Sequence, residues 1–534
     1  MTIEEIKKKQ EIERKDDVNK VKKSVHPRRV VVAGPGTGKS FLFQELIKEK
    51  KLEGKKDFVA ITFIGKLGDD LADNLCGLAK TMTMHGFARE FFLGTYNGWQ
   101  YYPGIYNIIK EDLEKEGVKK FKIGDENYKR KSIYYKAIGD ADVVHYAVEI
   151  CKKDSNKIPK HDLFLIDEFQ DFNEIESEFI DFISQENEIV IVGDDDQALY
   201  KFKNASSDYI RSKYDEKNID FESHTLRFCS RCTEVIIKYF HAIVEKFNLN
   251  EPSKNRIQKE YICYLPDKEN DSKANPKIHL IENCPTGMIA YKIRRELKEI
   301  TINQKVKDVL IIGEGKSCKT ILKNIANQLS NYGFKNLDYN KEDSVFGIKQ
   351  EIVDAYRFIE KDQSSLLGWR ILGNPVDEEI KDKHIKNSKT LNNIITGTPS
   401  KIKTIKDTDI DILENDIEEC SICDKEIRKY LLFQEIKNKN NNLSRPLGNL
   451  NVTVCNILKS KGLGADVVFV VGFDQGKFPA KNIPEESEIY QMLVALTRAK
   501  KIIYFINTTG VKVSIFINCL DKKDLKIEKI EYNR

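Results

Sequence analysis

Short apolar runs rich in β-branched residues recur along the chain, and each is followed by a polar or glycine-containing turn. Runs of this length and composition are typical of strands buried on both faces, as in a parallel sheet. The eight clearest runs are residues 28–34, 57–63, 161–168, 187–194, 307–313, 451–457, 466–473 and 501–507. Amphipathic stretches such as 41–50 and 309–333 separate them, so the pattern predicts an α/β protein.

The predicted strands form two groups, one before about residue 240 and one after about residue 275, which indicates two α/β lobes. Two further segments lack the strand rhythm and are rich in Lys, Asn, Tyr and Ile, so we expect mostly helical insertions. The predicted parts are a charged N-terminal segment (1–29), a first lobe (30–88 and 161–274) with an insertion (89–160), and a second lobe (275–342 and 446–534) with an insertion (343–445).

Length, charge and cysteine usage limit the class of protein. A chain of 534 residues exceeds what one hydrophobic core supports. The net charge is only +4, from 88 basic and 84 acidic residues, so any nucleic-acid contact must come from a local track. Eleven dispersed cysteines, the lack of an apolar leader and the shortness of the apolar runs predict a cytoplasmic protein without membrane spans.

The clearest chemical motif follows the first predicted strand and precedes a predicted helix. It reads Ala33-Gly34-Pro35-Gly36-Thr37-Gly38-Lys39-Ser40. Glycines let backbone N–H groups close on phosphate oxygens, and a helix N-terminus adds its dipole. Lys39 can then reach the outer phosphates of a nucleoside triphosphate, and Ser40 can bind Mg²⁺. The usual first glycine of such loops is Ala33 here.

A second motif places two adjacent carboxylates, Asp167 and Glu168, at the carboxyl end of the strand predicted at 161–168. Ligands of parallel sheets bind at that end. Asp167 is the predicted Mg²⁺ partner, and Glu168 is the predicted base that orients the attacking water. Taken alone, an Asp-Glu pair after a strand is as often a solvated strand end.

Several further segments occur in an order that resembles the UvrD/Rep-like superfamily 1 DNA helicases. They include Asp167-Glu168-Phe169-Gln170-Asp171, 191–200 and 494–500, together with 61–66, 83–87 and 459–466. The resemblance extends from residue 33 to about residue 501 and implies two RecA-like P-loop NTPase lobes. It also implies an ATP-dependent, Mg²⁺-dependent enzyme that moves on single-stranded or tailed duplex DNA, with 3′-to-5′ polarity.

The resemblance assigns roles to residues outside the first two motifs. Gln197 would sense the γ-phosphate, Gly462 would belong to the nucleotide-binding set, and Arg498 would reach the same phosphate from the second lobe. A second arginine is expected in a segment that fits residues 226–231, where Arg231 is the candidate and Arg227 the second choice. Such an arginine contributes on the order of 10³–10⁵ in rate.

The DNA contacts implied by the resemblance are aromatic side chains that stack on bases and nearby polar groups that bind the backbone. The expected DNA-binding residues are Phe63, Lys66, His85, Tyr200, Phe202 and Lys203. Aromatic residues at strand ends are equally often core residues, so core packing stays open for each of the three aromatics.

Three family features that read the nucleoside are missing or altered. The adenine-reading glutamine has no clear counterpart, since Gln10 lies too far upstream; the base-stacking tyrosine is Ser230; and the ribose-binding glutamate is Gly464. Each lost contact removes about 1 kcal/mol of selectivity. We therefore expect hydrolysis of GTP and other nucleotides to be better than in typical relatives.

Other interpretations stay open at this stage. Both insertions are shorter than those of well-known relatives, which favours an accessory ATPase that works only with a partner such as a separate nuclease. No nuclease domain is expected after residue 507. The pairs Cys229/Cys232 and Cys420/Cys423 have zinc-like internal spacing, although chance spacing is favoured. The N-terminal segment is expected to be a solvated helix, with a DNA or partner tether as the second choice.

Overall fold

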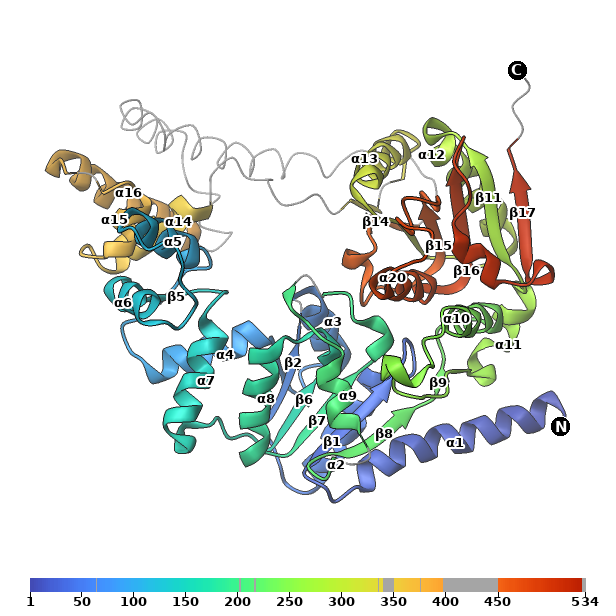
Figure 1. Cartoon of the computed structure of the whole chain (residues 1–534), viewed down its shortest axis with the longest axis horizontal. Coiled ribbons are helices and arrows are strands. Elements are labelled where there is room, and N and C mark those ends of the chain that lie inside the picture. Colours follow the sequence, from blue (N-terminus) through green and yellow to red (C-terminus); the bar gives the residue numbers. More distant parts are fainter. Residues whose placement is uncertain are drawn as a thin grey trace. The chain divides into compact units, whose positions relative to one another are not determined.

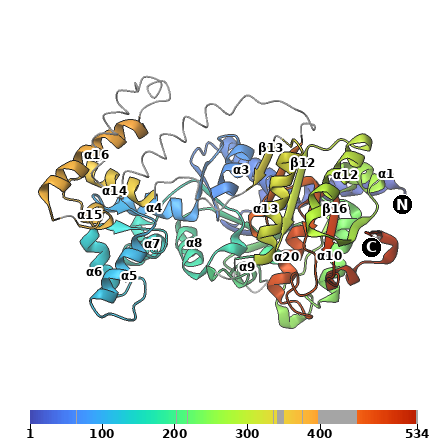
Figure 2. The same cartoon turned by 90° about the horizontal axis from the view of Figure 1, so that it is seen from above.

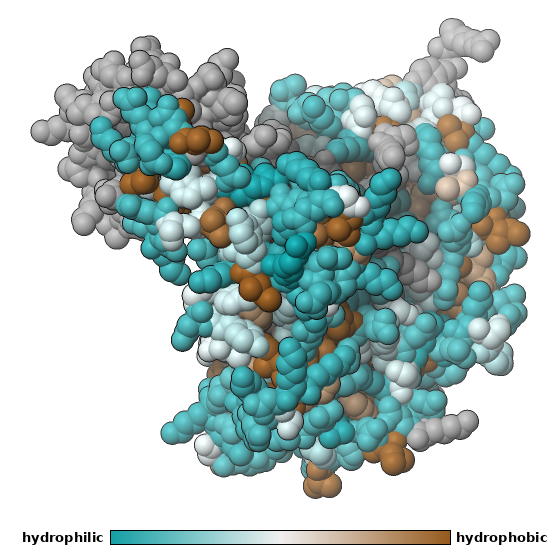
Figure 3. Space-filling model, turned by 60° about the vertical axis from the view of Figure 1, so that its left-hand side comes forward, coloured by the Kyte–Doolittle hydropathy of each residue, from teal (hydrophilic) through white to brown (hydrophobic). Residues whose placement is uncertain are grey.

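The computed structural model describes residues 1–63, 65–200, 203–215, 218–334, 336–339, 350–374, 376–396 and 450–530. These residues belong to two compact units: 1–84, 158–340 and 445–534 form one, and 85–157 with 341–444 form the other (Figure 1). Within the described ranges, none of the helices combines the length and the apolar character needed to cross a membrane. The face drawn in Figure 3 is mostly hydrophilic, with scattered hydrophobic residues.

The larger unit contains two sheets whose strands are all parallel. The first has the order β3-β2-β6-β7-β1-β8. Its strands are β1 (Arg28–Ala33), β2 (Phe58–Thr62), β3 (Lys80–Thr83), β6 (Leu163–Ile166), β7 (Ile189–Gly193) and β8 (Glu222–Leu226). The order places β1, β6 and β7 in the interior of the sheet, so the loops that follow these three strands emerge at one edge.

Helices cover both faces of the first sheet. On one face, alternate residues of β1, β2, β6 and β7 share a core with α1 (Ile3–Lys23), α2 (Lys39–Leu52) and α3 (Gly65–Leu75). On the other face, Ile210 of α9 (Asp208–Tyr214) packs over Gly193. Burial on both faces explains why the interior strands are unbroken apolar runs.

The second sheet has the order β13-β14-β12-β15-β16-β11-β17 and is also parallel throughout. Its strands are β11 (Ile278–Cys284), β12 (Asp308–Gly313), β13 (Asn336–Tyr339), β14 (Asn451–Asn456), β15 (Ala465–Val471), β16 (Ala499–Thr508) and β17 (Leu525–Lys529). On one face, α12 (Ile289–Asn303) and α13 (Lys316–Asn331) lie side by side and share its core (Figure 2).

The opposite face of the second sheet packs against helices from two parts of the chain. One is α20 (Glu486–Leu496), and the other is α10 (Glu234–Lys246), which follows the first sheet in sequence. Tyr239 of α10 lies with its ring centroid 6.1 Å from that of Phe505 in β16. Its hydroxyl donates to the Phe516 carbonyl at 2.8 Å. Residues that follow strands of the first sheet therefore belong to the hydrophobic core of the second sheet.

The described part of the smaller unit is mostly helical. It includes most of α4 (Met84–Thr95), then α5 (Ile105–Lys115), α6 (Glu126–Tyr135), α7 (Val143–Lys153), α14 (Gln350–Lys361), α15 (Leu366–Ile371) and α16 (Glu378–Thr396), and the short parallel strands β4 (Gln100–Tyr101) and β5 (Ala137–Ile138). Buried Leu367 joins a core built by α5 and α6, and the guanidinium of Arg370 donates to Asp112 at 2.9 Å. Helices from both predicted insertions thus share one core.

The α/β fold class predicted from the sequence is confirmed, and all eight predicted runs contain strands. The N-terminal segment differs from the expected solvated helix. It contains α1, which begins with a capping box at Thr2 but buries Val18 and Val21 against the first sheet. The buried positions form a narrow stripe among many charges, so the pattern was too weak to show it. The residue boundaries of the lobes and insertions stay predictions.

Candidate functional site

The glycine-rich loop joins β1 to α2 at the carboxyl edge of the first sheet. Gly36 and Gly38 have φ values of +72° and +99°, in the left-handed region that side chains disfavour. Gly38 is the N-cap of α2, so the unpaired N–H groups of the first helical turn border the loop. This geometry suits a phosphate group.

Two side chains lie so close to the loop that a side chain at either of two of its glycines would clash with them. A Cβ on Gly34 would lie 2.9 Å from the ring of Tyr261, and one on Gly36 would lie 2.3 Å from the Cβ of Arg231. The Tyr261 hydroxyl also donates to the Pro35 carbonyl at 2.8 Å. The loop is therefore held in place by residues that come after the first sheet in sequence.

Lys39 lies directly against the acidic pair at the end of β6. Its Nζ is 2.8 Å from Glu168 Oε1 and 4.0 Å from Asp167 Oδ1. Burial by itself would lower the pKa of Lys39, but Glu168 and Asp167 outweigh it and raise that pKa. Burial would likewise raise the pKa of Glu168, yet Lys39 and Lys461 hold it below its usual value. Lys39 and Glu168 are therefore both charged at neutral pH.

Ser40 and Asp167 offer the oxygen donors that Mg²⁺ prefers, a hydroxyl and a carboxylate. Burial raises the pKa of Asp167 to about 6. Besides Lys39, its Oδ1 accepts the N–H of Glu168 at 2.9 Å. The Asp167 side chain is 14% exposed, and a mostly buried carboxylate with few protein partners is one that a dication would stabilise in its ionised form. The pair therefore fits the predicted metal-binding role.

A chain of side-chain hydrogen bonds continues from Glu168 toward the second sheet. Gln170 donates to Glu168 Oε2 at 2.6 Å and accepts the N–H of Asp194 at 2.9 Å. Gln197 donates to Asp194 Oδ2 at 2.7 Å and accepts from Arg498 at 3.0 Å. The carboxyl ends of β6 and β7 are thus connected to the amino end of β16.

Arg498 is 1% exposed and enters the site from the turn between α20 and β16. Its guanidinium also donates to the carbonyls of Val494 and Leu463, at 3.0 and 3.1 Å. Burial lowers its pKa to about 10, so it stays charged at neutral pH. A charged guanidinium in a dry site is suited to stabilise negative charge that develops on a phosphoryl group.

The two candidates for the second arginine have different surroundings. Arg231 lies against the loop at Gly36, and a Cβ on Gly464 would be 3.5 Å from its Nε. Arg227 instead binds Asp17 of α1, with Nε and one terminal nitrogen each 3.0 Å from its carboxylate. The structure therefore brings Arg231, and not Arg227, to the loop. A side chain at position 464 would touch the Arg231 guanidinium.

Lys461 is a buried cation at the centre of the site that the sequence analysis did not single out. Its Nζ binds Asp171 Oδ2, donates to the Gln197 carbonyl at 2.8 Å and lies 3.7 Å from Glu168 Oε2. It follows the short 3-10 turn η7 (Leu458–Ser460) and precedes Gly462, which has a φ of +83°. Lys461 therefore joins the segment before β15 to the carboxyl end of β6.

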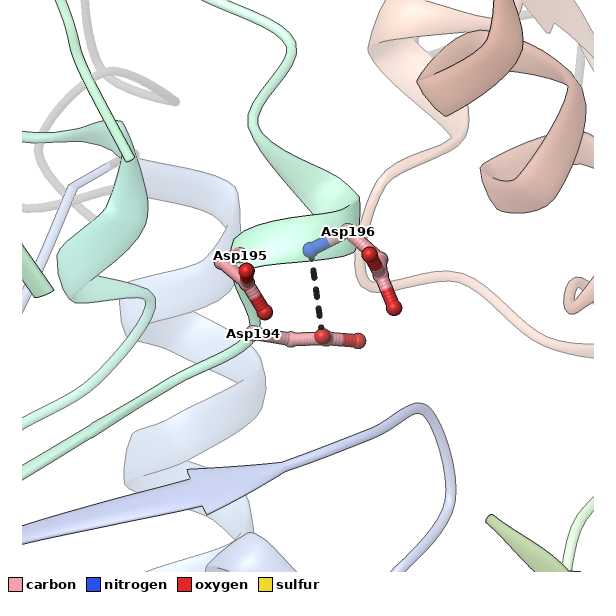
Figure 4. Close-up of side chains that lie close together, drawn as sticks. All are labelled: Asp194, Asp195 and Asp196. Atoms are coloured by element: carbon pink, nitrogen blue, oxygen red, sulfur yellow. Dashed lines mark hydrogen bonds between the residues drawn. The ribbon is translucent and has the colours of Figure 1, made fainter. Parts of the chain in front are cut away.

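Asp194, Asp195 and Asp196 form a buried acidic cluster next to Gln197 (Figure 4). The Nζ of Lys259 lies 2.6 Å from Asp195 Oδ1 and 2.9 Å from Asp196 Oδ2. Arg256 binds Asp196 through two nitrogens, each at 2.7 Å, and Arg211 binds Asp195 at 3.1 Å. Three cations thus offset the charge of three carboxylates, and one of these carboxylates, Asp194, accepts from Gln197.

The structure brings three of the residues expected to bind DNA together. Phe63 and Tyr200 have ring centroids 5.0 Å apart, and the Nζ of Lys203 lies 5.4 Å and 5.7 Å from the two centroids. The Tyr200 hydroxyl is 3.4 Å from the Leu458 carbonyl. His85 lies in the first turn of α4, in the other compact unit. Phe202 and the side chain of Lys66 lie outside the described residues.

The zinc interpretation gains no support from the described part of the chain. Cys229 and Cys232 are buried, and the N–H of Cys232 donates to Cys229 Sγ at 3.3 Å. Cys420 and Cys423 lie outside the described residues. All nine cysteines that the structure describes are free thiols.

The functional residues that sequence reasoning missed are mainly the partners of the predicted ones. Lys259 and Arg256 lie far from the acidic cluster in sequence and carry no motif of their own. Lys461 could have been found, because it stands inside the segment 459–466 that resembles a helicase motif. Its contacts with Asp171 and the Gln197 carbonyl, which follow strands of the other sheet, are seen only in the structure.

Comparison with known proteins places the first sheet in a known domain type. A family model described as an AAA domain matches residues 18–203. This range contains the glycine-rich loop, the acidic pair and Gln197.

Relatives with known names cover more of the chain. The "Probable DNA helicase II homolog" of Mycoplasma capricolum subsp. capricolum is 25% identical, over 71% of this chain and 62% of the relative. The protein of the same name in Mycoplasma genitalium is 21% identical, over 94% of this chain and 87% of the relative. One subunit of the "ATP-dependent helicase/nuclease" of Carboxydothermus hydrogenoformans is 29% identical, over 27% of this chain and 13% of the relative. The chain therefore spans less than two thirds of the first and third of these proteins.

Proposed function

We propose that the chain is a UvrD/Rep-like superfamily 1 helicase and that it hydrolyses ATP to move along single-stranded DNA. When the strand ahead is paired, this movement would separate the duplex. The proposed direction is 3′ to 5′, which rests on the family resemblance alone. The lobe and insertion boundaries predicted from the sequence are part of the proposal.

The observation that carries the proposal is the continuous set of contacts from Lys39 to Arg498. Lys39, Glu168, Gln197 and Arg498 come from segments that border strands of two different sheets, and hydrogen bonds or ion pairs connect them. A loop with phosphate-binding geometry lies at one end, and a buried arginine lies at the other. Such an arrangement can detect whether a γ-phosphate is present between the two sheets.

In the proposed reaction, Lys39 binds the outer phosphates of ATP and no longer pairs with Glu168. The freed carboxylate orients the attacking water, while Gln170 keeps Glu168 in place. Arg498 and Arg231 stabilise charge on the transferred phosphoryl group. Mg²⁺ held by Ser40 and Asp167 would neutralise charge on the β- and γ-phosphates. Loss of the γ-phosphate then changes the contacts of Gln197 and Arg498.

Movement requires that hydrolysis of the bound nucleotide change the contacts between the protein and the DNA. Tyr200 follows Gln197 by three residues, packs on Phe63 and contacts the Leu458 carbonyl in the segment before Lys461. A shift of Gln197 can therefore pass to two aromatic rings and to Lys203, which are the proposed DNA contacts. Base stacking on such rings is tolerant of sequence and contributes roughly 1–3 kcal/mol per base.

The proposal is tested with purified protein on duplexes that carry a 3′ tail or a 5′ tail. We expect ATP hydrolysis stimulated by single-stranded DNA and displacement of the strand on 3′-tailed substrate. Lys39→Ala should lower hydrolysis by about 10²–10³-fold, because a preorganised contact to the reacting phosphates is lost. A rate of ATP hydrolysis that does not depend on DNA, or that Lys39→Ala does not lower, would contradict the proposal.

A second candidate function is an accessory ATPase that works only within a complex. It is favoured by the relative from Carboxydothermus hydrogenoformans, whose name describes one subunit of a helicase/nuclease. A nuclease partner is therefore part of this alternative. DNA-stimulated hydrolysis without displacement on any tailed substrate would favour it over the first candidate.

A further inference from the structure

One short segment, residues 256–263, contacts several parts of the proposed triphosphate site, and its first part forms neither helix nor strand. Gln258 and Glu260 are exposed, whereas the Lys259 side chain is 4% exposed and Tyr261 is 3% exposed. This alternation is typical of an extended chain, in which residues two apart point to the same side. Lys259 and Tyr261 therefore face inward together.

Lys259 reaches Gln197 through a single carboxylate. Oδ1 of Asp194 accepts from Lys259 Nζ, and Oδ2 of the same group accepts from the Gln197 amide nitrogen at 2.7 Å. Burial raises the pKa of Asp194, and the charge of Lys259 is the strongest influence that opposes the rise. Lys259 therefore favours the ionised form of Asp194, which can only accept hydrogen bonds.

The charge of Asp194 fixes the orientation of the Gln197 amide. An ionised carboxylate can only accept, and a guanidinium can only donate. The amide nitrogen must therefore point to Asp194, and the amide oxygen must point to Arg498, from which it accepts at 3.0 Å. A protonated Asp194 could donate as well as accept, so this constraint would be lost.

Two further contacts attach the segment to the acidic cluster. The Ile257 N–H donates to Asp195 Oδ2 at 3.0 Å, and Arg256 binds Asp196 through two nitrogens. A two-pronged ion pair of this kind fixes direction as well as distance. The backbone from which Lys259 extends is therefore attached to the same cluster.

Tyr261 attaches the segment to the glycine-rich loop. Its hydroxyl donates to the Pro35 carbonyl, and its ring occupies the space that a side chain at Gly34 would need. Its ring centroid lies 5.0 Å from that of Phe240, and its carbonyl accepts from His241 Nε2 at 2.7 Å. Both of these residues belong to α10, so Tyr261 connects that helix to the loop.

The end of the segment pairs with the strand that leads to Arg231. β10 (Ile262–Cys263) runs parallel to β9 (Phe228–Cys229). Directly after β9, the Ser230 N–H donates to the Gly36 carbonyl at 2.9 Å, and Arg231 lies against Gly36. The segment is thus joined to the acidic cluster, to the loop and to the strand before Arg231.

We propose that residues 256–263 position the glycine-rich loop and Gln197 relative to each other, so that both meet one triphosphate. Lys259 acts on Gln197 through Asp194, and Tyr261 acts on the loop through Pro35. Both act through other groups, so they are positioning residues. The inference rests on the proposed function and adds to it two residues, one that governs the rate of hydrolysis and one that governs the affinity for the nucleotide.

Kinetics of Lys259 variants test whether this lysine acts through Gln197. Lys259→Met should lower kcat of DNA-stimulated ATP hydrolysis by about 10²-fold, the loss typical of a misplaced catalytic group, with KM little changed. In a Gln197→Ala protein the same change should lower kcat by less than about two-fold, because the group that Lys259 positions is already gone. Losses that multiply in the double variant would contradict the role of Lys259.

Lys292, in α12, is the matched control for the loss of a buried cation. Its side chain is also 4% exposed, and its Nζ lies 2.8 Å from Glu296 Oε1. Lys292→Met should reduce the free energy of unfolding, as Lys259→Met does, but leave kcat of the folded protein unchanged. An equal loss of kcat in both variants would mean that Lys259 matters only for stability.

Asp195→Asn separates stability from positioning if Lys259→Met is too unstable to assay. It removes one of the three carboxylates, so the double variant again has matched charges and should regain stability. Asp194 still lacks its cation, so kcat should stay low. Recovery of kcat together with stability would overturn the positioning role.

Tyr261→Phe should raise the KM for ATP by about five-fold, the loss of one hydrogen bond, with kcat little changed. Inorganic tripolyphosphate should lose affinity equally in calorimetry, because the loop is proposed to bind phosphates only. Tyr239→Phe is the control: it removes a buried hydroxyl that donates to the Phe516 carbonyl at 2.8 Å, and should not change KM. A change of kcat alone in Tyr261→Phe would contradict the proposed division between the two residues.

The outcomes separate this inference from the proposed function. If ATP hydrolysis depends on DNA and on Lys39, but the Lys259 and Tyr261 variants behave like their controls, the positioning role is wrong and the proposed function stands. If the wild-type protein binds neither ATP nor tripolyphosphate and hydrolyses no ATP, the proposed function fails and the positioning role fails with it.

Discussion

The outer-phosphate end of the site and the surroundings of Gly38 are built in contrasting ways. At the outer end, buried Glu168, Asp171, Asp194, Gln197 and Arg498 each bind another side chain through hydrogen bonds or ion pairs. The side chains beside Gly38 are Phe41, which is 49% exposed, and Arg14, whose closest polar partner, Ser230 Oγ, is 3.4 Å away.

The difference follows from the chemistry proposed for the outer end. Phosphoryl transfer needs fixed charges in a dry environment, because reorganising them during the reaction would cost rate. α1, which contains Gln10 and Arg14, instead attaches to residues that follow the first sheet. The comparison therefore predicts large effects on nucleotide hydrolysis for changes at the outer end and small ones for changes in α1.

The largest effect is expected for Arg498→Ala. The change removes the guanidinium from a buried position where it meets transition-state charge, so kcat of DNA-stimulated ATP hydrolysis should fall by about 10³–10⁵-fold. Arg498→Lys keeps a charge but not the hydrogen bonds to Val494, Leu463 and Gln197, and should recover little. A loss smaller than ten-fold would mean that Arg498 has only a structural role.

Lys461→Met should have the next largest effect, which is a decrease in the free energy of unfolding. The Asp171 carboxylate would be left buried without its cation, which typically costs about 3–5 kcal/mol of unfolding free energy. Urea denaturation measures this loss. The double variant Lys461→Met/Asp171→Asn should recover most of it.

Lys481→Met is the matched control, because Lys481 pairs with Glu485 while both side chains are more than half exposed. Exposed pairs contribute about 0–1 kcal/mol. Equal stability of the two methionine variants would contradict the proposed importance of the buried pair.

Acidification should weaken Mg²⁺ binding by a moderate amount. Burial raises the pKa of Asp167 to about 6, so below pH 6 the ligand-free protein holds a proton that the metal must displace. Affinity should fall about ten-fold per pH unit below 6 and stay level above it. Calorimetry with ADP, in the presence and absence of Mg²⁺, separates the metal from nucleotide protonation. Asp167→Asn should abolish the dependence.

The smallest effect on nucleotide use is expected for Gln10→Met. Gln10 donates to the Cys263 carbonyl at 3.1 Å and accepts the N–H of Leu265 at 2.8 Å. The variant leaves both groups without their side-chain partner, which costs about 1–3 kcal/mol of stability. The ratio of ATP to GTP hydrolysis should not change, because the Gln10 amide binds protein backbone rather than a base. A shift of that ratio would show that Gln10 reads adenine after all.

The sequence predicted the interior of both sheets better than their edges. All eight predicted runs contain strands, whereas β3, β8, β13 and β17 were not expected, and all four lie at sheet edges. An edge strand has one hydrogen-bonded neighbour and a partly solvated face, so it has no continuous apolar run. The interior strand β11 escaped notice because His279, Glu282 and Asn283 interrupt it.

The candidate site was predictable where chemistry is carried by neighbouring residues. The loop, the acidic pair and Gln197 stand at strand ends that periodicity locates. Lys259 and Lys461, in contrast, lie 65 and 290 residues from the aspartates that they bind, Asp194 and Asp171. Contacts between residues so far apart in sequence depend on how the folded segments pack together. Local sequence patterns do not predict this packing.

The position of α10 has a consequence for the synthesis of the chain. The helix is translated directly after the first sheet, but its apolar residues pack against β16, which begins more than 250 residues later than α10 ends. At about 5–20 residues per second, the ribosome needs roughly 12–50 seconds to make that stretch. During this time the apolar face of α10 has no β16 to pack against, which makes it a natural place for a chaperone to bind the nascent chain.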